Sequence, residues 1–315
     1  MLGYIFRRIL MLVPILLGVT IITFSTMHLA PGDPAELILR QRFGGEDPPR
    51  QAVEELREEM GLNIPVYVQY GRWLIKLAQG DLGNSLRTGR PVLTELLSRF
   101  PATLELALLS TFISLIIAVP VGIISAVKRN SLLDIFSMFG AMLGVSMPNF
   151  WLALLLMMFF SLHLGLFPVA GYGEFRYLVL PAFTLGTGMA AMVARLIRSS
   201  MLEIISQDYI LTARAKGLPY YRVINRHALK NAMIPVVTYV GLQLGWALEG
   251  AVIVESIFAR PGIGRYLHEA VFARDFPAIQ GCVLFFALVF VFSNLIVDIS
   301  YAYLNPKIRY GRGMK

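Results

Sequence analysis

Residues 276–297 read FPAIQGCVLFFALVFVFSNLIV, a stretch without a single charged side chain. An α-helix needs about 20 mostly apolar residues to cross the hydrocarbon core of a bilayer. Other charge-free runs of about this length, or slightly shorter, lie at residues 9–29, 106–127, 135–162, 177–194 and 231–248. Buried helices of soluble proteins seldom reach this length, and six in one chain are far outside expectation. The sequence therefore predicts an all-α integral membrane protein with six transmembrane helices.

Composition agrees with a membrane protein. Of the 315 residues, 56% are hydrophobic and 15% are charged, whereas soluble domains carry about 25% charged residues. The net charge of +8 would suit a nucleic-acid partner, but the basic residues occupy short segments between apolar runs, so we expect none. The lone Cys282 cannot form an internal disulfide, and no Cys/His spacing suggests zinc. We expect Cys282 to be a small packed side chain.

The distribution of Lys and Arg predicts the orientation. Six spans place both termini on one side, and that side carries basic clusters at 128–129, 195–198 and 214–230 but few acidic residues. Since cytoplasmic loops are enriched in Lys and Arg, we expect both termini in the cytoplasm. The first apolar run continues past the length of a signal peptide and lacks a cleavage site, so we expect residues 1–30 to remain as a span.

The segment at residues 31–101 is the least membrane-like part. Asp33 can cap a helix that starts at Pro34. Prolines at starts and glycines past ends predict three further short helices, which run from Pro49 to Gly61, from Pro65 to Gly80 and onward from Pro91. This outer segment is either a folded spacer or a docking surface for an external protein.

Three residues within the spans are candidates for a transport pathway. Pro148 in the third span and Pro235 in the fifth each remove one backbone hydrogen bond and should bend their helices. Glu249 lies toward the outer part of the fifth span, where it either binds a cationic group of a solute or makes an ion pair near the interface. Gly186 in the fourth span permits close helix contact.

The cytoplasmic segment at residues 206–231 carries the strongest local signals. Asp208 is a suitable N-cap for a short helix at 209–216, Gly217 stands where a left-handed residue ends a helix, and Pro219 prevents continuation. A second helix starts near Tyr220 and leads into the fifth span. Composition alone leaves two interpretations open: a solvated basic loop at the lipid headgroups, or a docking site for another protein.

The motifs here resemble a known family. Thr212-Ala213-Arg214-Ala215-Lys216-Gly217, followed by Arg226-His227-Ala228-Leu229-Lys230-Asn231-Ala232, is similar to the permease signature of bacterial dipeptide, oligopeptide and glutathione ABC importers. Further similar motifs extend the resemblance over nearly the whole chain: Pro31-Gly32-Asp33-Pro34, Gly80-Asp81-Leu82-Gly83, Arg198-Ser199-Ser200, Arg260-Pro261-Gly262-Ile263-Gly264-Arg265 and Asn305-Pro306. The resemblance is to the permease subunit with the long outer loop.

The resemblance implies a type I ABC importer permease fold in a bacterial inner membrane. Its parts would be a first span at 1–30, an extracytoplasmic helical segment at 31–101, a permease core at 95–304 and a cytoplasmic tail at 305–315. The implied partners are a homologous second permease, two ATPase subunits, an external solute-binding protein and the lipid bilayer. The chain itself would need no cofactor, because ATP and magnesium would bind to the ATPases. The implied coupling helix lies at about 208–217, and its residues are Asp208, Tyr209, Thr212, Ala213, Arg214, Ala215, Lys216 and Gly217.

Other function classes are less well supported. The chain has no Gly-x-x-x-x-Gly-Lys-Ser/Thr motif and so no P-loop of its own, and its four histidines pair with no nucleophile, so we expect no enzyme site. A proton-coupled carrier should have ionisable residues deep in its spans, and a scaffold without transport would not need a glycine-ended cytoplasmic helix. The solute stays open among dipeptides, oligopeptides, glutathione and nickel chelates.

Overall fold

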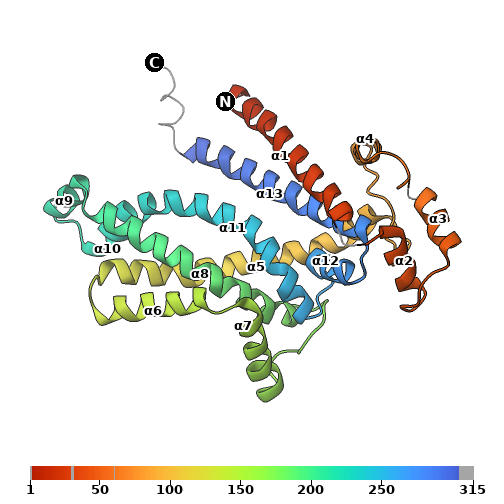
Figure 1. Cartoon of the computed structure of the whole chain (residues 1–315). Coiled ribbons are helices and arrows are strands. Elements are labelled where there is room, and N and C mark those ends of the chain that lie inside the picture. Colours follow the sequence, from red (N-terminus) through yellow and green to blue (C-terminus); the bar gives the residue numbers. More distant parts are fainter. Residues whose placement is uncertain (1, 30–31, 60, 305–315) are drawn as a thin grey trace. The chain divides into compact units, whose positions relative to one another are not determined.

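In the part of the chain that the structure describes, the regular structure is helical, apart from an isolated β-bridge between Asn84 and Pro91. The computed structural model describes the backbone of residues 2–29, 32–59 and 61–304, and their side chains except at 2–9, 26, 41–42, 59, 249 and 298–304. The chain forms two compact units, and the helices of each can be found in Figure 1 by their labels. Unit 1 comprises Met1–Ala102 and Pro261–Val291, and unit 2 comprises Thr103–Arg260 and Phe292–Lys315.

Unit 1 combines the start of the chain with a late segment. Its helices are α1 (Leu2–Leu29), α2 (Pro34–Arg42), α3 (Arg50–Glu59), α4 (Val66–Ala78), the first part of α5 (Val92–Val127), α12 (Ile263–Phe272) and most of α13 (Phe276–Leu304). Val92, Leu96, Tyr266 and Cys282 are buried together in its core. The expectation that Cys282 is a packed side chain is therefore confirmed.

The short helices α2, α3 and α4 follow the proline and glycine signals. Asp33 accepts a hydrogen bond from the Ala35 amide at 3.0 Å and so caps α2. The helices α3 and α4 begin directly after Pro49 and Pro65. Gly61 and Gly80 adopt φ of 67° and 82° past the ends of these helices, a region that glycine enters at little cost.

The helix expected to start at Pro91 is not a separate short helix. It is the first part of α5, which continues through Pro101 to Val127. A proline inside a helix removes one hydrogen bond. Packing on both sides offsets that loss, because Leu96 before Pro101 and Leu106 after it are fully buried.

The aromatic residues of α4 pack on α1 within unit 1. The Tyr70 hydroxyl lies 2.9 Å from Thr20 Oγ1, and the rings of Tyr70 and Trp73 lie 5.4 and 5.7 Å from that of Phe24. Tyr67 is exposed. The helix α4 is thus attached to the first span through aromatic contacts.

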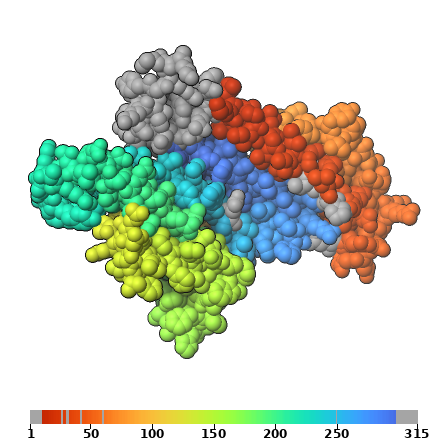
Figure 2. All heavy atoms as spheres, turned by 60° about the vertical axis from the view of Figure 1, so that its left-hand side comes forward, coloured from red at the N-terminus to blue at the C-terminus, as the bar shows by residue number. Residues whose placement is uncertain are grey.

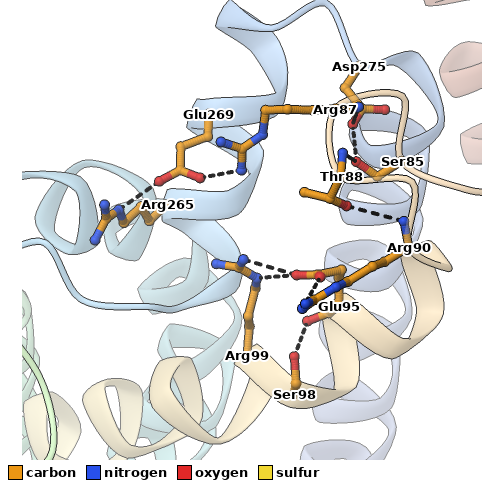
Figure 3. A network of polar contacts seen from close by, with 10 residues as sticks. All are labelled: Ser85, Arg87, Thr88, Arg90, Glu95, Ser98, Arg99, Arg265, Glu269 and Asp275. Carbon is orange, nitrogen blue, oxygen red and sulfur yellow. Dashed lines mark hydrogen bonds and ion pairs between the residues drawn. The ribbon is translucent and has the colours of Figure 1, made fainter.

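A polar network, shown in Figure 3, holds the turn before α5 against the late helices of unit 1. The buried carboxylate of Asp275 accepts hydrogen bonds from Ser85 Oγ at 2.5 Å and from the Arg87 amide at 3.3 Å. Arg87 also pairs with Glu269 of α12 at 2.7 Å, and Arg265 bonds to the same carboxylate at 2.9 Å. These charge-assisted bonds fix the turn at 84–91 to α12 and to the start of α13.

Unit 2 contains the remaining helices. They are the rest of α5, α6 (Leu132–Ser146), α7 (Asn149–Leu156), the π-helix η1 (Met157–His163), α8 (Arg176–Ile205), α9 (Asp208–Ala215), α10 (Tyr220–Arg222), the π-helix η2 (Val223–Ala228), α11 (Leu229–Ile257) and the last part of α13. A Cβ atom at Gly186 of α8 would lie 2.8 Å from the Ser110 carbonyl oxygen of α5. Glycine therefore allows these helices to approach, as the sequence predicted.

Within the described residues, five helices are long and apolar enough to cross a membrane. A sixth span results if α6 and the α7–η1 helix, which meet at an angle of 102°, count as one. The break falls at Met147 and Pro148, where Pro148 is the N-cap of α7. The predicted bend at Pro148 is confirmed. Pro235 lies inside α11, and a bend at that position stays a prediction.

Candidate functional site

The short helix α9 lies between α8 and the helices that lead into α11. Figure 1 shows it at the end of unit 2 where α5 turns into α6, and Figure 2 shows its teal surface projecting from that end. It starts after Gln207, whose carbonyl accepts hydrogen bonds from the amides of Ile210 and Leu211. The prediction of a helix here is confirmed. The expectation that Asp208 is the N-cap is wrong, because Asp208 is the first helical residue, where its charge favours the positive end of the helix dipole.

One face of α9 packs on its own protein. Ile210 is fully buried and Ala213 is buried, and both join a core cluster with Val223 and Ile224 of η2. Ala213, which the resemblance places in the coupling helix, therefore packs on its own protein. A helix of two turns is marginal in water, so it needs this buried face. The other predicted residues are exposed: Asp208, Tyr209, Thr212, Arg214, Ala215, Lys216 and Gly217.

Gly217 ends α9 in the predicted conformation. Its φ is 76°, and its amide donates a hydrogen bond to the Arg214 carbonyl at 2.9 Å. Two residues later, Pro219 is the N-cap of α10. A Cβ atom at Gly217 would meet no atom within 4 Å, so the backbone conformation alone requires glycine.

Two side-chain contacts attach α9 to the helices after it in the chain. Asn231 Nδ2 in α11 donates a hydrogen bond to the Tyr209 hydroxyl at 2.9 Å, and the Arg214 guanidinium lies 5.2 Å from the centre of the Tyr220 ring. Sequence reasoning missed both, because no spacing rule relates residues on either side of a turn. Together with Gly217, they connect α9 directly to the start of the fifth span.

A further polar cluster fastens the turn between α5 and α6 to α8. The buried Asp134 carboxylate accepts hydrogen bonds from Ser125 Oγ, from the Asn130 amide at 3.0 Å, and from Arg198 Nε and Nη2 at 2.8 and 2.7 Å. Arg198 stands two turns before the end of α8, which continues into α9. The cluster therefore joins three helices near the attachment of α9. In the sequence, Asp134 is only one of the few acidic residues on the basic side, and nothing local predicts its pairing with Arg198.

The three candidate pathway residues differ in their position relative to a cavity of unit 2. Pro148 lies at the break between α6 and α7, next to a cavity of about 290 Å³. Pro235 is exposed on α11 and does not line this cavity. Glu249 lies in α11, but its side chain is outside the described residues.

The cavity lies within unit 2 between the α6–α7 break, α8 and α11. Its polar lining comes from Asn149, Tyr239 and Gln243, and its apolar lining includes three methionines and Trp246. None of its described lining residues is charged. A pocket of this size and mixed character is suited to a small neutral group.

These features define a multi-pass helical membrane protein with a short exposed helix between two spans. Solved structures share this fold. Chains of the inward-facing MetNI methionine ABC transporter match 67% of this chain and 96% of their own length with a TM-score of 0.58 and 20% identity. A chain of an amino acid ABC transporter matches with a TM-score of 0.53 and 14% identity, over 67% of this chain and 94% of its own. The predicted type I ABC importer permease fold is confirmed.

Sequence comparison gives the family. Residues 118–310 match the binding-protein-dependent transport system inner membrane component family, and residues 1–107 match the N-terminal region of such components. A dipeptide transport system permease of Alkalihalophilus pseudofirmus is 46% identical over 98% of this chain and 100% of its own. A glutathione transport system permease of Salmonella paratyphi A is 44% identical with the same coverage. The chain therefore belongs to this family of transport-system membrane components.

Proposed function

We propose that this chain is a permease subunit of an ABC importer for peptides of the dipeptide and glutathione class. The observation that carries the proposal is the identity of 46% and 44% to a dipeptide and a glutathione permease, each matched over its full length. Identity at this level spans both units rather than a single motif. It therefore supports a shared transport role more strongly than the fold alone does.

The exposed face of α9 supports a role in binding a partner. Its exposed face presents a carboxylate, a tyrosine and two cations beside the left-handed Gly217, and its buried face fixes the helix to the spans. We infer that an ATPase subunit docks on the exposed face in the cytoplasm, where both termini also lie. A second permease would complete the path, and an external binding protein would deliver the solute.

The test is uptake by the assembled complex in proteoliposomes. Labelled dialanine, glutathione and a nickel chelate are offered with the binding protein, with and without ATP inside the vesicles. We expect ATP-dependent uptake of a peptide substrate. Uptake driven by a proton gradient without ATP, or ATP-dependent uptake of the nickel chelate alone, would contradict the proposal.

A further inference from the structure

One side of the cavity in unit 2 is lined by polar side chains of α11. Tyr239 and Gln243 are one turn apart on α11 and so share a face of the helix, and both line the cavity. Gln243 is only 4% exposed. Its Nε2 donates a hydrogen bond to the Met189 carbonyl of α8 at 3.3 Å. Because a carbonyl oxygen can only accept, this bond fixes which way the amide points.

The other end of the Gln243 amide is an acceptor without a donor. Gln243 Oε1 is buried and has no hydrogen-bond partner within the described part of the chain, while the Tyr239 hydroxyl interacts with the Gln243 side chain. Buried polar atoms are nearly always paired in native proteins. An unpaired acceptor at the wall of a cavity is therefore a place where a ligand or a water donates a hydrogen bond.

A third polar group, Asn149, lines the cavity beside two glycines. A Cβ atom at Gly188 would lie 3.5 Å from Asn149 Oδ1, and one at Gly250 would lie 3.5 Å from Asn149 Nδ2. The Asn149 amide, which carries both a donor and an acceptor, thus lies close to the backbone of both glycines. The cavity combines neutral donors and acceptors with methionine side chains, which adapt to varied apolar shapes.

We propose that this cavity is a solute site in which Gln243 Oε1 accepts a hydrogen bond from the peptide N–H of the transported molecule. The proposal rests on the proposed function and names a specificity-determining residue within it. A peptide bond supplies the donor that Gln243 lacks and an acceptor for the Asn149 or Tyr239 side chain. The uncharged lining suits the amide rather than either charged end of a peptide, because an unpaired charge is costly to bury.

The experiment measures discrimination between two solutes. Proteoliposomes with the complete complex import labelled dialanine and its analogue methylated at the peptide nitrogen, in wild type and in Gln243→Met. Discrimination by the binding protein is common to both complexes, so it cancels when their preferences are compared. Methionine keeps the length of the side chain but cannot accept a strong hydrogen bond.

We expect the preference for dialanine over the methylated analogue to fall by about 2–12-fold in Gln243→Met, the effect of one neutral hydrogen bond. Thr238→Val is the matched control on the same helix. Thr238 bonds to its own helix and does not line the cavity, so its variant should keep the wild-type preference. Gln243→Leu, which also removes the acceptor, provides a second test if Gln243→Met does not assemble, and we expect a fall in the same range.

An unchanged preference in Gln243→Met, or in Gln243→Leu if that variant must replace it, would overturn the inference and leave a cavity occupied by water alone. A wild-type complex that imports no peptide with ATP would instead overturn the proposed function. The two failures are therefore distinguishable in one set of measurements.

Discussion

Replacing Gly217 with valine should uncouple ATP hydrolysis from transport. The φ of 76° at this position is left-handed, which costs an L-residue roughly 1–2 kcal/mol and costs more for a β-branched side chain. A Cβ atom there has open space, so steric clash adds nothing. A cost of about 1.4 kcal/mol lowers the population of the native α9–α10 turn about tenfold relative to competing conformations.

The assay records transport and ATPase rates of the complete complex in proteoliposomes. We expect the Gly217→Val complex to reach the membrane but to assemble poorly with its ATPase, or to hydrolyse ATP with transport reduced several-fold. Gly217→Asn is the matched control, because asparagine enters the left-handed region more readily than valine and should retain most of the coupling. Wild-type values of both rates in Gly217→Val would refute the reasoning.

The remaining predictions concern charge and orientation. Arg214→Glu should weaken ATPase docking about tenfold by reversing an exposed charge next to Tyr220; normal copurification of the ATPase would argue against docking there. Asp134→Asn should destabilise the complex by about 3 kcal/mol or less, because Arg198 loses its carboxylate but is a quarter exposed; the midpoint of thermal unfolding in detergent measures this, and an unchanged midpoint would contradict it. The predicted topology places Glu174 outside and Arg129 in the cytoplasm, so a cysteine at Glu174 should react with an impermeant thiol reagent in intact cells and a cysteine at Arg129 should not. The native thiol is buried and should add no background; the reverse labelling would invert the topology.

Much of the fold could be predicted because its signals are local. The length of each apolar run, the prolines that start α3 and α4, and the glycine that ends α9 act through the backbone of their own residues. Pro101 shows where such signals fail. A proline ends a helix only if nothing outweighs the lost hydrogen bond, and the burial of Leu96 and Leu106 on either side is a tertiary property.

The candidate site was predictable in place but not in detail. The position of α9 and the left-handed Gly217 followed from capping rules. Three details depend on how distant segments pack against each other: the burial of Ala213, the hydrogen bond between Tyr209 and Asn231, and the ion pair of Asp134 with Arg198. No periodicity in the sequence encodes the angle at which α9 leaves α8, and that angle determines which of its faces is buried.

The buried face of α9 has a thermodynamic consequence for association. Ordering a residue costs about 1–2 kcal/mol of backbone entropy, so an unstructured segment of eight residues would lose on the order of 10 kcal/mol on docking. Ile210 and Ala213 already hold α9 in its helical form. A protein that binds its outer face therefore meets a preorganised surface, and the complex can dissociate and reform without folding and unfolding this helix each time.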